Sequence, residues 1–498
     1  MGGYISPTLR KRLNIMLFTS VFSLIFVFYL WTASSNEKPF VFRFSKEANS
    51  YHSYMADAFL HGQLNLRIDP NPKLLALEDP YDPVANEAYR LHDASLYHGK
   101  YFLYFTPTVA LLFIAPMKLI FGYFISEILL TAIFCFIGVV FSYLILIRIL
   151  RIGLVQTSLP ILLFSALLLA VATTVPFLLR RPAVYELCIS AGYCFMMIGT
   201  YFLVISMTNR RSRSRWIQIF SAGILIGLCF SSRPSQIPTC GLLIMAFFFV
   251  RYYLFREKNL SMMRDALFLL TPVILIGAVM GWYNYARFGS IFEFGISYQL
   301  AGVNYHRIDI MAPIYIPLGL YHYIFQTIPF DLRFPFFHVV RPIAPIRIPF
   351  FYYYEQTIGL LSLPVYWLLI PPLFCLRSIW RISPSFLMIA LFIFSGSMLS
   401  LVVVSSVVGP TMRYIVDFSP LLLLATLSLF FSVQPMIFSQ LGPGPQIRRL
   451  SFYIPALFTI FISISISMSG YFDSFRNLNP QLYHKIEHFF HIGLNVIY

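Results

Sequence analysis

Residues 124–147 read FISEILLTAIFCFIGVVFSYLILI, an apolar run with a single charged side chain, Glu127. A helix of this length and composition spans the hydrocarbon core of a bilayer. Ten further runs of the same kind predict spans at 14–33, 158–178, 187–206, 217–236, 238–255, 266–286, 357–376, 385–408, 414–432 and 451–470. We therefore expect an all-α polytopic membrane protein with about 11 transmembrane helices, in which residues 1–498 form a single integral membrane domain.

The overall composition supports a membrane protein. The chain is 58% hydrophobic and only 11% charged, whereas soluble domains are about a quarter charged. The net charge of +16 comes from short basic clusters between apolar runs, which is typical of membrane topology and not of nucleic-acid binding. We expect membrane lipids as partners and no nucleic acid. The six cysteines fall in apolar runs without a CxxC pair, so neither a disulfide framework nor a metal site is indicated.

The run 101–121 is apolar, but Pro107, Pro116 and Lys118 interrupt it. If it does not cross the membrane, nearly all compact basic clusters fall on one side, and only Arg180-Arg181 falls on the other. These clusters are Arg148/Arg151, Arg210/Arg211/Arg213/Arg215, Arg256/Lys258/Arg264, Arg377/Arg381 and Arg448/Arg449. The positive-inside rule then favours a re-entrant or juxtamembrane helix at 101–121 and a cytoplasmic N-terminus. We expect a bacterial inner (cytoplasmic) membrane location.

This topology predicts three extracytoplasmic regions: a first loop at 34–123, a second loop at 287–356, and a C-terminal tail at 471–498. Eight of the 20 acidic residues lie between 43 and 107, within the first loop. The second loop is rich in Pro, Tyr, Phe and Arg, which suits short helices lying at the headgroup level. We expect the active site on this extracytoplasmic face.

Ionisable residues at the outer ends of the predicted helices are the first candidates for function, because charge at membrane depth is costly. They include Arg181, Arg233, Arg287 and Arg413, together with Glu186 and Glu293. Guanidinium groups bind phosphate through paired hydrogen bonds, and a carboxylate can act as a general base. The alternative is that these charges only pair with one another or reach the lipid headgroups.

Three motifs resemble a known family. They are Glu47-Ala48-Asn49-Ser50-Tyr51 with Gly62 after it, Lys100-Tyr101-Phe102-Leu103-Tyr104 with Pro107, and Arg413-Tyr414 followed by Pro420. With the order of spans and loops, they resemble the GT-C superfamily of membrane glycosyltransferases, in the branch of protein O-mannosyltransferases and aminoarabinose transferases. The resemblance implies a GT-C-like fold. It also implies transfer of a sugar from an isoprenoid-phosphate-linked donor to an extracytoplasmic lipid, glycan or protein, with inversion.

The resemblance also implies residue roles. Glu47 stands where the family has its catalytic Asp, but the usual Asp-Glu pair is Glu47-Ala48 here, which leaves Asp57 as a rival base. The donor phosphate would be bound by Arg181, Arg233, Arg287 and Arg413. The sugar or acceptor would be bound by Tyr51, His92, Asp93, Lys100, Tyr104, Glu186 and Glu293. The sequence specifies no cofactor; the displacement is expected to be metal-independent or weakly metal-assisted, since His52, His61 and His92 leave a divalent metal open although no ligand spacing demands one.

Two other functions stay open. A transporter or flippase of lipid-linked saccharides should show inverted repeats with broken helices in matching positions, and no such repeat is visible in the sequence. A polysaccharide polymerase or ligase would rely on a large late outer loop, for which the second loop is a candidate.

Overall fold

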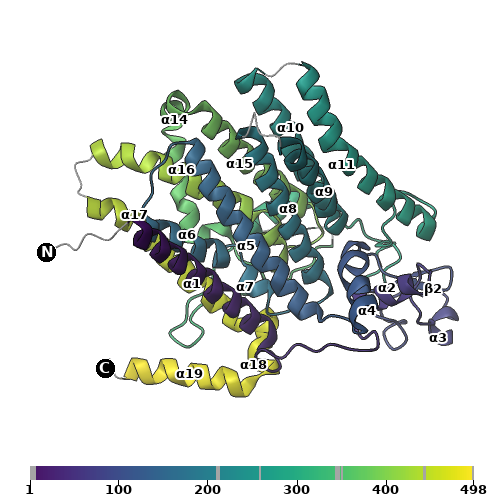
Figure 1. The fold of residues 1–498 in the computed structure, drawn as a ribbon. Helices are drawn as coiled ribbons and strands as arrows, with labels where there is room; N and C mark the ends of the chain where they lie inside the picture. The colour runs from purple at the N-terminus through teal and green to yellow at the C-terminus, as the bar shows by residue number, and fades with distance from the viewer. Residues whose placement is uncertain are drawn as a thin grey trace.

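The computed structural model describes residues 7–208, 214–256, 259–342, 348, 351–440 and 445–495. The predicted basic residues Arg210, Arg211, Arg213 and Lys258 and the last three residues of the predicted tail lie outside these ranges. Long helices dominate the described chain and pack side by side as one bundle (Figure 1). Extended backbone is confined to one short hairpin and a few isolated bridges within these residues.

Ten helices in the described ranges are long and apolar enough to cross a membrane, and a bent pair raises the number to 11. This confirms the predicted all-α polytopic architecture. The ten are α1 (Pro7–Ser34), α5 (Glu127–Ile152), α6 (Leu159–Val171) with α7 (Val175–Leu178), α8 (Val184–Thr208), α9 (Arg215–Ser232), α10 (Ile237–Phe255), α11 (Asn259–Phe288), α15 (Pro384–Ser405), α16 (Ser419–Gln440) and α17 (Pro445–Ser469).

The predicted span at 357–376 does not form one regular helix. The chain instead runs through the 3-10 turns η4 (Leu360–Ser362) and η5 (Pro364–Leu369) and the short helices α13 (Ile370–Leu373) and α14 (Leu376–Ile382), with a bend of 73°. Three prolines, at 364, 371 and 372, remove backbone donors and prevent a continuous helix. Such irregular backbone is tolerated where protein surrounds it. Here the Val365 N–H donates to Thr459 Oγ1 at 2.9 Å, and the Tyr366 hydroxyl donates to the Ala172 carbonyl at 3.2 Å.

The run 101–121 also behaves differently from a span, as the charge pattern predicts. After strand β2 (Lys100–Phe102), the helical part of this run is the π-helix η1 (Ala110–Ile114) continued by α4 (Ala115–Phe121). Twelve helical residues cover roughly 18 Å, well short of a bilayer core of about 30 Å. The segment packs against α2 (Tyr51–Leu60) beyond the ends of the long helices (Figure 1).

One end of the bundle gathers the predicted outer regions, and we call it the loop end. The first loop contains α2, α3 (Pro72–Leu75) and the hairpin of β1 (Ser95–Tyr97) with β2; the second contains η3 (Pro313–Tyr315) and α12 (Ile316–Phe325). Backbone hydrogen bonds tie these loops together, from Asp93 N to Leu300 O at 2.8 Å and from Leu96 N to Tyr298 O at 2.9 Å. The Met311–Val407 bridge adds the turn after α15 to the same layer.

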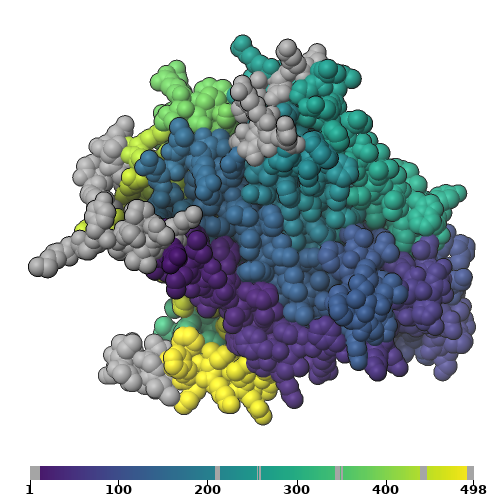
Figure 2. Space-filling view, in the orientation of Figure 1, coloured from purple at the N-terminus to yellow at the C-terminus, as the bar shows by residue number. Residues whose placement is uncertain are grey.

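The C-terminal tail reaches the loop end too. It consists of η7 (Tyr471–Asp473), α18 (Ser474–Leu478) and α19 (Pro480–Asn495), and Asn479 Nδ2 donates to the Ser35 carbonyl at 2.8 Å, just after α1. In the space-filling view the first loop covers the lower right of the molecule, and the yellow tail projects at the lower left (Figure 2). The opposite end holds the C-terminus of α5 and the start of α15, joined by Ser383 Oγ to Ile152 O at 3.3 Å.

Close helix packing in the bundle depends on small residues, as at Gly223 of α9. A Cβ at Gly223 would lie 2.3 Å from the Leu269 carbonyl oxygen and 2.6 Å from Pro272 Cγ, both on α11. We expect Gly223→Val to destabilise the protein by about 1–3 kcal/mol, because α9 and α11 must separate.

Gly241→Val on α10 is the matched control, since a Cβ there meets no atom within 4 Å. Thermal unfolding of both variants in one detergent measures the difference. Equal melting temperatures for the two valine variants would contradict the close α9–α11 contact.

Candidate active site

A cavity of about 340 Å³ opens at the loop end, between the two loops and the helix ends. The first loop contributes His92, Asp93 and Tyr104, the turn before α8 contributes Arg181, and the first turn of α8 contributes Tyr185. The rest of the wall comes from the second loop, the turn after α15 and η6 (Met412–Asp417), including Gln299, Tyr305, Tyr353, Glu355, Thr411, Arg413 and Tyr414. The predicted outer regions therefore meet around one polar space.

Asp93 is the carboxylate that the first loop presents to this cavity. Its backbone is left-handed, with φ 62°, which costs energy for a residue other than Gly but is adopted most readily by Asn and Asp. Gln299 Nε2 donates to Asp93 Oδ1 at 2.8 Å and also to the Tyr185 hydroxyl at 3.1 Å. No hydrogen bond to Oδ2 is found from any residue that the structure describes. Asp93 is thus held through one oxygen while the other stays available as a proton acceptor.

Arg413 lies between two buried carboxylates. Its Nη1 is 3.6 Å from Glu186 Oε1, its Nη2 is 3.5 Å from Glu355 Oε2, and its guanidinium lies 4.6 Å from the centre of the Tyr185 ring. Both oxygens of Glu186 are buried and lack a hydrogen-bond partner among the described residues. Arg413 thus lies between two acidic groups, and the Glu186 carboxylate is buried behind it without a hydrogen bond from any described residue.

Arg181 is the exposed cation of the cavity. Its guanidinium lies 5.6 Å from the centre of the Tyr471 ring, and no carboxylate of the described chain comes within 4.0 Å of it. Nearby, burial raises the pKa of Tyr305 to about 12, with smaller contributions from Tyr414 and Asp93. The Tyr305 hydroxyl therefore stays protonated and can donate a hydrogen bond to a ligand.

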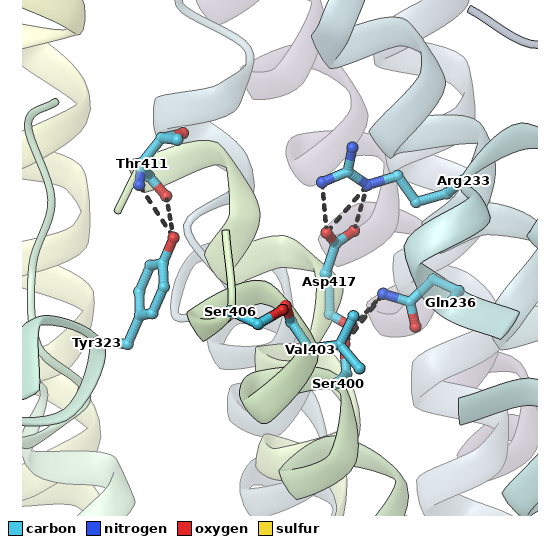
Figure 3. A network of polar contacts seen from close by, with 8 residues as sticks. All are labelled: Arg233, Gln236, Tyr323, Ser400, Val403, Ser406, Thr411 and Asp417. Carbon is cyan, nitrogen blue, oxygen red and sulfur yellow. Dashed lines mark hydrogen bonds and ion pairs between the residues drawn. The ribbon is translucent and has the colours of Figure 1, made fainter. Parts of the chain in front are cut away.

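Arg233 was predicted to bind phosphate, but its guanidinium is already paired with Asp417. Nε and Nη2 approach Asp417 Oδ2 at 3.0 and 2.7 Å (Figure 3). The Asp417 carbonyl accepts hydrogen bonds from Gln236 Nε2 at 3.3 Å and from Ser400 Oγ at 3.0 Å. This network fixes the C-terminal end of η6, the turn that carries Arg413 and Tyr414.

The other end of the same turn is fixed by Tyr323 of α12. Its hydroxyl accepts the Thr411 N–H at 3.0 Å and donates to the Thr411 carbonyl at 3.3 Å (Figure 3). Arg287, another arginine predicted to bind phosphate, also makes contacts within the protein. It is buried, donates to the carbonyls of Leu103 at 2.5 Å and Tyr283 at 3.3 Å, and does not line the cavity. It joins the end of α11 to the segment that follows β2.

The two predicted catalytic acids lie outside this cavity. Glu47 is exposed, and its backbone N–H donates to Ser45 Oγ at 3.2 Å. Asp57 Oδ2 pairs with Arg67 Nη1 at 3.0 Å, and its Oδ1 lies 3.5 Å from His61 Nδ1. The assignment of either residue as the base stays a prediction from the sequence.

Of the remaining residues predicted to bind the sugar or the acceptor, some line the cavity and others do not. The Tyr51 hydroxyl donates to the His92 carbonyl and so supports the segment that carries Asp93. Lys100 is exposed on β2 and does not line the cavity. Glu293 accepts from Gly295 N at 2.5 Å and Ser297 Oγ at 2.9 Å, within its own turn. The cavity therefore brings together His92, Asp93, Tyr104, Arg181 and Arg413, with Glu186 behind Arg413.

Sequence reasoning did not select Glu355, Gln299 or Tyr305. Glu355 carried a usable signal, because it is the only acidic residue between Asp331 and Asp417. Gln299 and Tyr305 carried none, since their roles follow from the pairing of the two loops. Within the described ranges, no group of three or more His, Cys, Asp or Glu side chains is arranged to hold a metal ion.

No protein-family model matches the chain, and no curated protein matches it in sequence. Three solved structures are similar over 93% of this chain. The apo oligosaccharyltransferase of Archaeoglobus fulgidus has 13% identity, a TM-score of 0.48 and 55% of its chain covered. ArnT from Cupriavidus metallidurans bound to undecaprenyl phosphate has 11% identity, a TM-score of 0.46 and 76% of its chain covered. The A. fulgidus oligosaccharyltransferase AglB with an inhibitory peptide and a dolichol-phosphate has 13% identity, a TM-score of 0.43 and 56% of its chain covered.

The chain thus spans about half the length of the two oligosaccharyltransferase chains. At these identities and TM-scores the similarity concerns the overall arrangement of helices, and it assigns neither a substrate nor a site.

Proposed function

We propose that the chain is a membrane glycosyltransferase that moves a sugar from an isoprenoid-phosphate-linked donor to an acceptor at the loop end. The observation that carries this proposal is the cavity in which Asp93 faces the same space as Arg181 and Arg413. Two of the three motifs that resemble the GT-C superfamily contribute to its wall, through Tyr104 and through Arg413-Tyr414. A proton acceptor and cations around one cavity suit displacement of a phosphate from a sugar.

In the proposed reaction, an acceptor oxygen attacks the anomeric carbon while the bond from that carbon to the phosphate oxygen breaks. The departing lipid phosphate gains negative charge, which Arg181 and Arg413 stabilise. Asp93 Oδ2 takes the proton of the acceptor. One direct displacement inverts the anomeric configuration. Because Arg413 is already shared by two carboxylates, Arg181 is the main phosphate ligand in this scheme.

The sugar occupies the space between these charges. Tyr104, Tyr185 and Tyr305 border it with aromatic faces and hydroxyl groups, and the Gln299 amide holds the Asp93 carboxylate toward it. The acceptor is a lipid, glycan or protein. In this scheme the predicted acids Glu47 and Asp57 support the loop from outside the cavity.

The proposed orientation places the loop end outside the cytoplasm. The basic residues Arg151, Arg215 and Arg381 lie at the last turn of α5, the start of α9 and the last turn of α14, away from the loop end. By the positive-inside rule that end faces the cytoplasm. In a bacterium the protein would then lie in the inner membrane with its cavity open to the periplasm.

Arg181→Gln tests the proposed phosphate site. We expect kcat/KM for the donor to fall at least about tenfold, through both a higher KM and a lower kcat, because the proposed Arg181 contact binds the donor phosphate and strengthens as that phosphate departs. The assay uses purified protein, a labelled undecaprenyl-phosphate sugar and a membrane extract as the acceptor source, and it follows release of undecaprenyl phosphate. Lys73→Gln, an exposed cation on α3 outside the cavity, is the control.

Two outcomes would contradict the proposal. One is that the parental protein releases no undecaprenyl phosphate above the extract alone. The other is that it moves intact labelled donor across a vesicle bilayer without releasing the phosphate lipid, which would instead favour a flippase.

A further inference from the structure

The peptide bond between His92 and Asp93 is held from both sides. Its N–H, which belongs to Asp93, donates to the Leu300 carbonyl of the second loop at 2.8 Å. Its carbonyl, which belongs to His92, accepts the Tyr51 hydroxyl of α2. Rotation of this peptide plane by about half a turn would carry Asp93 from φ 62° into the extended region that most residues prefer. The two hydrogen bonds oppose that rotation.

The helix that carries Tyr51 begins on a buried carboxylate. Glu127 is the single charged side chain of the apolar run 124–147, and it is the first residue of α5. Its Oε1 accepts the backbone N–H of His52, the second residue of α2, at 3.1 Å. A carboxylate at a helix N-terminus satisfies a free N–H group and interacts favourably with the helix dipole. Glu127 therefore ties the start of α2 to a membrane-spanning helix.

The His52 side chain makes a second contact with the same carboxylate. It is fully buried, with Nδ1 3.5 Å from Glu127 Oε1 and Nε2 3.3 Å from Cys188 Sγ on α8. Burial by itself lowers the pKa of His52, but Cys188 and Glu127 raise it to about 10. The imidazole is therefore charged at neutral pH and pairs with Glu127. None of these three residues lines the cavity, so their contacts act on the site only through α2 and its neighbours.

We propose that Glu127 is a positioning residue for sugar transfer, because it fixes the start of α2, from which Tyr51 holds the peptide bond before Asp93. This inference rests on the proposed function, in which Asp93 Oδ2 takes the acceptor proton. Gln299 holds the carboxylate of this base, and the connection from α5 through α2 holds its backbone. A displacement of about 1 Å at a reacting group can lower a rate by about 10²-fold. Loss of the connection should therefore lower kcat.

The test compares variants of the full-length protein in the assay of undecaprenyl phosphate release. Tyr51→Phe removes only the hydroxyl that donates to the His92 carbonyl. Glu127→Gln keeps an oxygen that can accept the His52 N–H but removes the charge, whereas Glu127→Ala removes both. Tyr54→Phe is the control, because Tyr54 also lies on α2 and its hydroxyl makes no hydrogen bond to any residue that the structure describes.

We expect Tyr51→Phe to lower kcat about tenfold, because Asp93 then spends part of its time in the extended conformation. The KM for the donor should stay unchanged, since the proposed phosphate contacts come from Arg181 and Arg413. Glu127→Ala should lower kcat at least as much, and Glu127→Gln should lower it less. In an Asp93→Asn background Tyr51→Phe should lower kcat no further, whereas a general loss of structure would lower it again.

Thermal unfolding shows which variants retain the fold. A folded Tyr51→Phe variant with the parental kcat would overturn the proposal, and so would a second loss of about tenfold in the Asp93→Asn background. A folded Glu127→Ala variant with the parental kcat would show that α2 is held without this carboxylate.

Hydrogen exchange tests the same connection without catalysis. Mass spectrometry of peptides that cover residues 90–96 reports on the Asp93 amide. We expect this amide to exchange about tenfold faster in Tyr51→Phe, and faster also in both Glu127 variants, than in the parental protein and the control. Unchanged exchange in folded Tyr51→Phe and Glu127→Gln variants would overturn the proposal. If exchange changes as expected but the parental protein releases no undecaprenyl phosphate, only the proposed function is contradicted.

Discussion

Asp93→Asn is expected to lower the kcat of sugar transfer by about 10²–10⁴-fold, because the amide cannot accept the acceptor proton. The substitution preserves the shape of the side chain. Asn also tolerates the left-handed backbone at this position, and its carbonyl oxygen can still accept the hydrogen bond from Gln299 Nε2. The KM for the donor should change little, since the proposed phosphate contacts come from Arg181 and Arg413 and not from Asp93.

The matched variants are Glu47→Gln and Asp57→Asn, each of which also exchanges one carboxylate for an amide in the first loop. Release of undecaprenyl phosphate from the labelled donor is measured for all three, with thermal unfolding to compare their folds. The cavity geometry predicts that only the variant at Asp93 loses kcat. If Glu47→Gln loses it instead, the residue suggested by the family resemblance is the base, and Asp93 only contacts the sugar.

Apolar length and charge bias predicted most of the fold, because the membrane imposes both on the sequence directly. The interruptions at Pro107, Pro116 and Lys118 correctly indicated that 101–121 does not cross as one helix. The predicted span at 357–376 is wrong as one regular helix, because Pro364, Pro371 and Pro372 break it just as clearly. Hydropathy measures how apolar a segment is, whereas the positions of its prolines indicate whether its backbone can form a continuous helix.

The site was harder to predict, because the sequence does not show which charge has a partner. Arg233 and Asp417 are 184 positions apart, yet they form an ion pair in the structure, and the role of Arg233 as a phosphate ligand stays a prediction from the sequence. Arg287 is instead engaged by backbone carbonyls, one of them from the first loop. The choice between Asp93 and the other acids of the first loop depends on the pairing of that loop with residues near Leu300. Local sequence carries no signal for such a long-range contact.

Arg413→Met is expected to destabilise the protein by about 3–5 kcal/mol, because it leaves two carboxylates without their shared cation. The side chains involved are buried: Arg413 is 11% exposed, Glu355 4% and Glu186 0%. Thermal unfolding in detergent measures the loss. Arg307→Met is the control, since Arg307 pairs with Asp79 at 3.3 Å but is 73% exposed; a surface pair of this kind contributes no more than about 1 kcal/mol.

A rescue variant separates the charge effect from the loss of packing. Glu186→Gln and Glu355→Gln together remove both buried negative charges, so adding them to Arg413→Met should restore most of the melting temperature. Sugar transfer should stay low in this triple variant, because the cation that faces the leaving phosphate is still missing. Full recovery of transfer would show that Arg413 only balances the two carboxylates and would leave Arg181 as the sole phosphate ligand. A melting temperature that the triple variant does not improve would mean that the Arg413 side chain stabilises the turn by its packing on Tyr185.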